Sequence, residues 1–361
     1  MTSALGPADP RAAARRRRVI AAVLRALLWA ALVALVWYVV RVLRRLDWVA
    51  VGDAIGLLRW WQAGVLLVLV AVRQLLASAP LALFTAGLGV PRAVANDLVG
   101  VLVATVTPAP ADIVARAALF RAWGVDVGRG LAGLVLNSVL FYAVRLGMPV
   151  AGAVLMLWTV GDETAVGWTA AVSGSVAVLI VVGLALVFRG SASAGAVGRW
   201  AGGMAQRVRP TWPGPDQLER QLVEFHGNVA DRWERFWGWA SGSLMLMVGV
   251  ESMILVAALR FVGVTPAQAP MLVVVAAYLS VYLLTATPFI GIGVLDAALV
   301  ALISDRAPAS PSSLVAGVII WRVCIQLVPL AAGLVPLIAL RGARSGPSGP
   351  TPPDPRRSSL A

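Results

Sequence analysis

Long apolar runs alternate with short polar segments along most of the chain. The longest runs cover approximately residues 19–43, 60–83, 130–158, 166–188, 238–262 and 313–340. Each of them reaches or exceeds the roughly 20 residues that cross a bilayer as a helix. The pattern therefore predicts an all-α polytopic membrane protein with about six full transmembrane helices.

Two further apolar stretches, 93–107 and 271–287, are too short for this role. As a helix, the first would be roughly 22 Å long, whereas the hydrocarbon core of a bilayer is about 30 Å thick. Each stretch ends at a proline, and a second short helix is expected after it, over 111–122 and 294–304. Because such broken backbone occurs at membrane depth only inside protein or beside a water-filled cavity, we predict two re-entrant helical hairpins.

The two breaks share a short motif. It occurs first as Thr105-Val106-Thr107-Pro108 and again as Thr285-Ala286-Thr287-Pro288. A charged residue follows each proline at the same spacing, Arg116 in the first copy and Asp296 in the second, and a later apolar run contains Arg145 or Arg322. This repeated layout predicts an internal duplication.

The chemistry of the break residues fits an interrupted helix. Proline removes a backbone donor, and glycine lets backbone approach a ligand closely, although a simple turn is the alternative. The residues assigned to the breaks are Thr107, Pro108, Pro110, Thr287, Pro288, Gly291 and Gly293.

The distribution of charge predicts the topology. Residues 1–18 end in four arginines, and we expect them to form a cytoplasmic basic N-terminus. A single transmembrane domain over 19–340 would contain repeat one (about 60–158), a cytoplasmic amphipathic segment (about 189–237) and repeat two (about 238–340). A disordered cytoplasmic tail is expected over 342–361, which is rich in Ser, Pro and Arg. Three full spans separate the hairpins, so the repeats would be inverted, as in secondary transporters of the cell membrane.

The overall composition supports a membrane protein and narrows its chemistry. Of 361 residues, 60% are hydrophobic and 13% are charged, and the net charge is +13, with arginine as the only basic residue apart from one histidine. We assign this charge to loops beside anionic lipid and not to nucleic-acid binding. One cysteine and one histidine allow no internal disulfide, thiolate metal site or His-based triad. We therefore assign no catalytic residues, metal or cofactor.

Ionisable residues inside the apolar segments are the main candidates for function. They are Arg73, Asp112, Arg116, Arg145, Glu251, Asp296 and Arg322. Each costs about 2.5–3.5 kcal/mol on insertion scales. Structural salt bridges are one explanation, with Asp112 and Arg116 at i, i+4 as the simplest pair. Four arginines against three carboxylates leave an excess positive charge, which favours a phosphate partner.

This excess charge predicts a headgroup site between the hairpins. Arg116, Arg145 and Arg322 would hold the phosphate, and Asp112 and Asp296 would orient the arginines or bind a cationic headgroup or a proton. The helices that begin after Pro110 and Gly293 would offer free N–H groups to the anion. Arg73 and Glu251 are secondary intramembrane charges.

Two segments carry a resemblance to a known family. Residues 108–116 contain prolines, Asp112 and Arg116, and residues 288–296 contain a proline, two glycines and Asp296, with Arg322 in a later span. This arrangement resembles the transmembrane region of lysylphosphatidylglycerol synthase/flippase proteins, although Ala111 and Asp296 replace the usual glycine and glutamate. The resemblance implies a flippase-like membrane module without the soluble synthase domain.

Three functions remain open from the sequence. The leading hypothesis is translocation of an anionic phospholipid or lipid-linked intermediate, with membrane lipid as the partner. A membrane-embedded enzyme acting on a lipid or polyprenyl phosphate is the second, with Asp112 or Asp296 as the base. The third is an accessory subunit whose intramembrane charges contact a protein of an envelope-biosynthesis complex. The absence of a nucleophile pair or nucleotide-binding loop favours the translocator over the enzyme.

Overall fold

A computed structural model describes residues 56, 58–107, 110–160, 164–208, 213–286 and 293–344. Within these ranges the chain is almost entirely helical and has no strand, which confirms the all-α class. The helices are α3 (Trp60–Phe84), α4 (Val90–Val106), α5 (Ala111–Ala122), α6 (Val127–Val160), α7 (Thr164–Phe188), α8 (Ser191–Val208), α9 (Pro215–Phe261), α10 (Met271–Val281), the 3₁₀ helix η1 (Tyr282–Ala286), α11 (Val294–Ser304), α12 (Pro311–Arg322) and α13 (Val328–Arg344).

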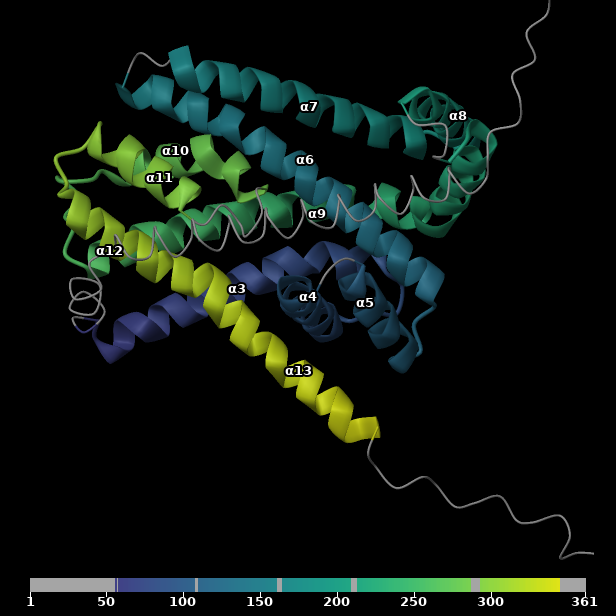
Figure 1. Ribbon diagram of the computed structural model, residues 1–361, viewed down its shortest axis with the longest axis horizontal. Helices are drawn as coiled ribbons and strands as arrows, with labels where there is room; N and C mark the ends of the chain where they lie inside the picture. Colours follow the sequence, from purple (N-terminus) through teal and green to yellow (C-terminus); the bar gives the residue numbers. More distant parts are fainter. Residues whose placement is uncertain are drawn as a thin grey trace, which may run out of the picture.

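Five segments of the described chain are long and apolar enough to cross a membrane. They are Trp60–Phe84, Val127–Trp158, Ala170–Phe188, Ala230–Phe261 and Pro311–Ile338. Most of them run along the long axis of the molecule (Figure 1). They confirm five of the six predicted spans, and the protein is therefore a multi-pass membrane protein. The sixth predicted span, 19–43, and the basic segment before it lie outside the described residues.

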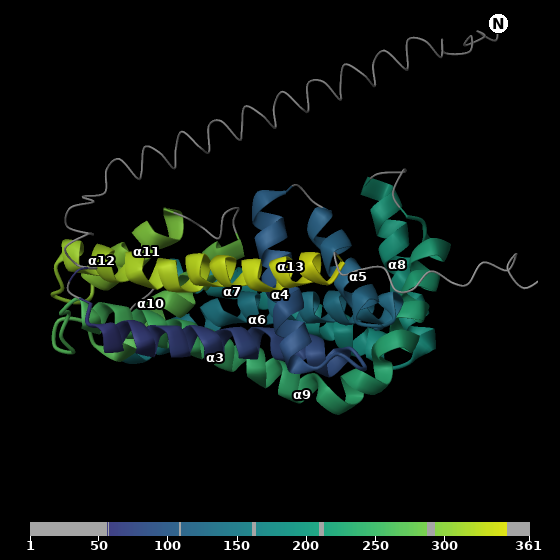
Figure 2. The ribbon, with the colours of Figure 1, turned by 90° about the horizontal axis from the view of Figure 1, so that it is seen from below.

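One helix, α9, joins two elements that the sequence analysis separated. The second part of the predicted amphipathic segment and the span after it form a single helix of 47 residues, Pro215–Phe261, which would be about 70 Å long if straight. Figure 2 shows that α9 curves at the end nearest α8. Its apolar stripe packs under the bundle, where the ring centroids of Trp233 and Phe188 of α7 lie 4.6 Å apart. Nothing in the sequence between Trp233 and Ala240 breaks a helix strongly enough to divide it.

Helix α8 forms the first part of the segment that was predicted to be amphipathic and cytoplasmic, and it packs against the start of α9. Three glycines, Gly195, Gly198 and Gly202, lie on the face that meets the start of α9. A Cβ atom on Gly198 or Gly202 would overlap the backbone of Glu219 or Pro215. The small residues therefore allow α8 and α9 to pack at close range.

The two predicted pairs of short helices are present. α4 and α5 form the first pair, and α10 with η1 and α11 form the second; α5 and α11 have the predicted limits. Figure 2 shows α4 and α5 standing side by side, across the direction of α3 and α13. Pro108, Thr287, Pro288 and Gly291 of the breaks lie outside the described residues. Re-entry from opposite sides and the inverted repeat stay predictions.

The last span is interrupted by a π-helical turn, Val323–Leu327, between α12 and α13. α12 begins at a serine cap, where the backbone N–H of Ser313 donates to Ser310 Oγ at 3.3 Å, with Pro311 in the first turn. α13 ends the described chain at Arg344, three residues into the predicted tail. The apolar character is continuous across the π turn, so the sequence pattern alone did not reveal it.

Glycine sets the closest approach between α6 and the second short pair. A Cβ atom on Gly152 of α6 would overlap the backbone of Ser280 in α10, whereas one on Gly147 would meet nothing. Small residues commonly allow membrane helices to pack backbone against backbone. Position 152 therefore has no room for a side chain.

We predict that Gly152→Ala destabilises the protein by about 1–3 kcal/mol, because one methyl group forces α6 and α10 apart. Gly147→Ala, in the same helix but facing open space, should leave the stability unchanged or slightly higher, since alanine favours helix. Thermal unfolding of both purified variants in detergent tests this. Equal midpoints would contradict the packing described here.

Candidate functional site

An ion pair between Arg73 of α3 and Glu251 of α9 lies at the centre of the bundle. Glu251 is 3% exposed. Arg73 Nη2 lies 2.6 Å from Glu251 Oε1, and Arg73 Nε donates to the same oxygen at 2.8 Å. Two arginine nitrogens on one carboxylate oxygen make a strong, charge-assisted contact. The two residues predicted as secondary charges are therefore partners of each other.

The second oxygen of Glu251 is also occupied. Tyr278 of α10 and Tyr282 of η1 donate their hydroxyls to Oε2 at 2.8 and 3.0 Å. In addition, the indole N–H of Trp321 in α12 donates to the backbone carbonyl of Glu251 at 3.2 Å. This cluster, which we call the Glu251 hub, joins α3, α9, α10, η1 and α12.

Arg116 of α5 pairs with Asp97 of α4, and not with Asp112 as the simplest sequence pairing had it. Arg116 Nη2 lies 3.3 Å from Asp97 Oδ1. Arg116 Nη1 also donates to Asn96 Oδ1 at 3.3 Å. Gly100 provides the space, because a Cβ atom there would overlap the guanidinium. Two adjacent residues of α4 thus hold the arginine of α5 inside the first pair of short helices.

Asp97 and Asn96 were missed because they lie in a stretch read only as apolar. No fixed helical spacing relates either of them to Arg116, so no local pattern indicated that they pair. The available signal was simply an Asn-Asp pair inside a short membrane segment, which is costly without partners. With Asp97 included, four arginines face four carboxylates, and the predicted excess of positive charge by count is wrong.

Gln74 connects the Arg116 pair to the Glu251 hub. Its side-chain carbonyl accepts from Arg73 Nη1 at 3.2 Å, and its amide donates to Asp97 Oδ2 at 2.7 Å. Gln74 is itself buried. One continuous polar network therefore runs from the first pair of short helices to the second.

Asp296 and Arg322 form a third pair, between α11 and α12. Arg322 Nη2 lies 2.5 Å from Asp296 Oδ1, and Nε donates to the same oxygen at 3.1 Å. The other carboxylate oxygen accepts the backbone N–H of Gly293, whose φ of 83° favours glycine, at 2.9 Å. That N–H was predicted to be free for an anion, but Asp296 already occupies it.

Arg145 is different from the other three arginines. It lies near the middle of α6 and forms no ion pair or hydrogen bond within the described residues; its Nε is buried without a partner. Its guanidinium carbon lies 4.5 Å from the ring centroid of Phe141 and 5.5 Å from that of Tyr142. It is also close enough to Tyr282 to interact with it electrostatically. Aromatic rings stabilise this cation but do not neutralise it.

The predicted site residues therefore do not form one cluster. α5, which contains Arg116, and α11, which contains Asp296, lie toward opposite ends of the bundle (Figure 1). Asp112 is half-buried and has no ion pair among the described residues. It lies in the first turn of α5, where the helix dipole favours a negative charge. Thr107, the residue after the end of α4, donates its hydroxyl to the carbonyl of Val103 in that helix at 2.6 Å.

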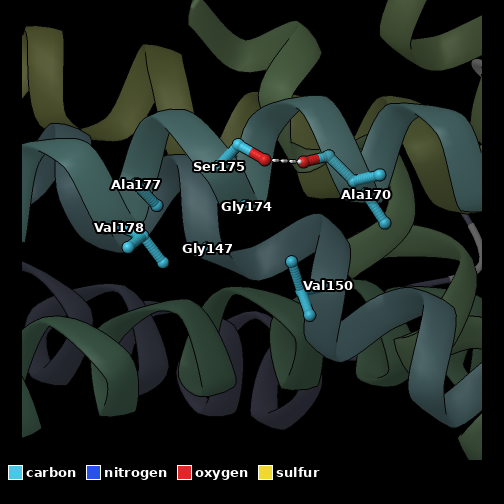
Figure 3. A pocket seen from close by; sticks show the side chains of 8 residues that line it. Gly147, Val150, Ala170, Gly174, Ser175, Ala177 and Val178 are labelled. Carbon is cyan, nitrogen blue, oxygen red and sulfur yellow. Dashed lines mark hydrogen bonds between the residues drawn. The ribbon is translucent and has the colours of Figure 1, made fainter.

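An open groove of about 510 Å³ between α6 and α7 is separate from all these charges (Figure 3). Gly147 and Val150 line it from α6, and Ala170, Gly174 and Val178 line it from α7. Its one hydroxyl, Ser175, already donates to the carbonyl of Ala171 at 2.7 Å. A groove of this kind suits hydrocarbon and not a charged headgroup.

We predict that Glu251→Gln destabilises the protein by about 3–5 kcal/mol, because it leaves Arg73 buried without a counter-charge. Glu219→Gln, which removes the partner of the half-exposed Arg199, should cost less than about 1 kcal/mol. Chemical denaturation in detergent compares the two. The double variant Arg73→Met/Glu251→Met should recover part of the loss, and no recovery would argue against a direct pairing effect.

Comparison with known protein families places this chain in one of them. The family described as the lysylphosphatidylglycerol synthase TM region matches residues 22–333. Comparisons with curated proteins and with solved structures gave no match. The match to the family covers well over half of the 361 residues. It includes every helix described here up to the middle of α13, and the chain therefore belongs to the family of the lysylphosphatidylglycerol synthase transmembrane region.

Proposed function

We propose that this protein binds and translocates an anionic phospholipid, or a lipid-linked intermediate with a phosphate group, across the cell membrane, with both of its termini in the cytoplasm. Membership of the family points to a lipid-related function in the membrane. The five described spans supply the membrane setting. The chemistry that would recognise the lipid comes from the intramembrane charges.

The unequal pairing of those charges supports one binding residue over the others. In the proposed duplication, Arg116 corresponds to Asp296, and Arg145 corresponds to Arg322. The second half has opposite charges at these two positions, and they form an ion pair. The first half has two arginines, which cannot form an ion pair with each other. Arg116 instead pairs with Asp97, and Arg145 has no carboxylate partner among the described residues.

Arg145 is therefore the residue that we propose binds the phosphate, and its unpaired guanidinium is the observation that carries the proposal. A cation in mid-membrane is costly unless an anion meets it. The planar guanidinium can bind two phosphate oxygens at once, and the weakly hydrated group tolerates the stacked rings of Phe141 and Tyr142.

The remaining predicted residues take supporting roles in this proposal. The Asp97–Arg116 and Asp296–Arg322 pairs hold the two pairs of short helices in one arrangement. The Glu251 hub includes residues of the second pair directly and is linked to the first pair through Gln74, so a shift of one pair is transmitted to the other through the polar network. Alternating access by movement of such repeats is the behaviour expected of inverted-repeat carriers.

We predict that Arg145→Ala lowers translocation at least tenfold, since a hydrogen bond to a charged group contributes about 1.5–3 kcal/mol. The assay uses the full chain in vesicles with fluorescent phosphatidylglycerol, and measures how fast the label reaches a membrane-impermeant quencher. Arg92→Ala, which removes an exposed arginine at the start of α4, is the matched control and should behave as the wild type.

Arg145→Lys separates charge from geometry in the same assay. It should retain part of the rate, because lysine keeps the charge but loses the bidentate contact. Wild-type rates for a folded Arg145→Ala protein would overturn the role of Arg145. Equal rates for protein-containing and protein-free vesicles would overturn translocation itself.

A further inference from the structure

Four buried polar side-chain atoms have no hydrogen-bond partner in the described part of the chain. They are Thr85 Oγ1, Asn137 Oδ1, Arg145 Nε and His226 Nδ1. Three of the four lie on or against α6. Protein, ordered water or a ligand satisfies nearly all buried polar groups in native structures, so a line of atoms without a protein partner is a place where a ligand can bind.

The three atoms follow one face of α6. Gly133, Asn137, Phe141 and Arg145 recur every four residues, which places them on the same side of the helix. Thr85, just after the end of α3, meets this face at Gly133, because a Cβ atom on Gly133 would overlap its hydroxyl. We call this set the α6 polar stripe.

The spacing along the stripe can be estimated from the contacts. Side chains of a helix lean toward its N-terminus, and the guanidinium carbon of Arg145 accordingly lies over the ring of Phe141 at 4.5 Å. The cation is therefore level with Phe141, one turn from Asn137, at about 6 Å along the axis. Thr85 lies about one further turn on, toward the end of the bundle where α3 ends and α6 begins.

We propose that the α6 polar stripe is the headgroup path of the translocator and that it selects a phospholipid with a hydrogen-bond donor beyond its phosphate. Arg145 binds the phosphate, and Asn137 Oδ1 accepts from a hydroxyl or amine of the headgroup. Thr85 offers the next contact toward the end of the bundle. This inference rests on the proposed function, and it adds the class of lipid and two binding residues.

The side-chain oxygen of Asn137 would discriminate between lipids whose headgroups have a hydrogen-bond donor and lipids whose headgroups have none. A carbonyl oxygen accepts hydrogen bonds and cannot donate one. Phosphatidylglycerol brings hydroxyls and phosphatidylethanolamine brings an amine, whereas phosphatidylmethanol has the charge of phosphatidylglycerol without any donor. When a lipid without the donor binds, the buried oxygen of Asn137 stays unpaired. This cost is the source of discrimination.

The test is binding of these three lipids, with identical acyl chains, to the purified full-length protein, measured by native mass spectrometry in competition. The wild type should prefer phosphatidylglycerol to phosphatidylmethanol, which has the same net charge; the zwitterionic phosphatidylethanolamine shows what a donor contributes without a net negative charge. Asn137→Leu should reduce that preference by about three- to tenfold, the effect of one neutral hydrogen bond. Arg145→Ala should weaken all three lipids alike.

Ser138→Ala is the matched control, since the Ser138 hydroxyl already donates to the carbonyl of Leu134 at 2.8 Å. It should bind as the wild type. Asn137→Leu should keep or raise the thermal midpoint, because it removes an unsatisfied polar atom. If that variant does not fold, Thr85→Val gives the same readout with the same expected direction.

The outcomes separate this inference from the proposed function. A wild type with no preference for lipids that carry a donor, or an unchanged preference in Asn137→Leu, would overturn the role of the stripe even if translocation is observed. A preference that depends on Asn137, found in a protein that moves no lipid in vesicles, would support the stripe and overturn translocation.

Discussion

The buried pair of Arg73 and Glu251 is the contact on which the arrangement of helices depends. A lone charge at this depth would be expensive, so each partner makes the other tolerable. The carboxylate has no spare capacity, because two arginine nitrogens and two tyrosine hydroxyls occupy its oxygens. Such a fully satisfied network specifies one geometry, since any rotation of α3, α9 or α10 breaks several bonds at once.

The network also explains why the unpaired Arg145 matters. Several other polar groups of the bundle have hydrogen-bond partners: Gln74 links two ion pairs, and Asp296 accepts from both a backbone N–H and an arginine. Within the part of the chain that the structure describes, Arg73, Arg116 and Arg322 each pair with a carboxylate, whereas Arg145 does not. The rings of Phe141 and Tyr142 stabilise the cation, and the proposed phosphate would supply its counter-charge.

Much of the fold followed from the sequence, because span length and apolar content dominate in a membrane. The limits of α5 and α11 were predicted from proline and glycine signals alone. The continuity of α9 was not predicted, since a change from amphipathic to fully apolar character does not end a helix. Pairing was the weakest part: the partner of Arg116 lies on another helix, and no local spacing shows that Asp97 faces it. Within the described residues, Thr85 Oγ1 and Asn137 Oδ1 have no hydrogen-bond partner because no donor on a neighbouring helix reaches them. Such a missing tertiary contact cannot be predicted from the sequence.

The π-helical turn in the last span fixes the relative phase of two surfaces. A π turn contains one residue more than an α-helical turn, so the side chains of α13 are rotated by about 100° relative to a continuous α12. Before the turn, Trp321 and Arg322 face the Glu251 hub and Asp296. After it, Gly333 lies against the backbone of Leu98 in α4. An uninterrupted helix could align one of these faces but not both, so the extra residue allows a single span to hold the two halves of the protein together.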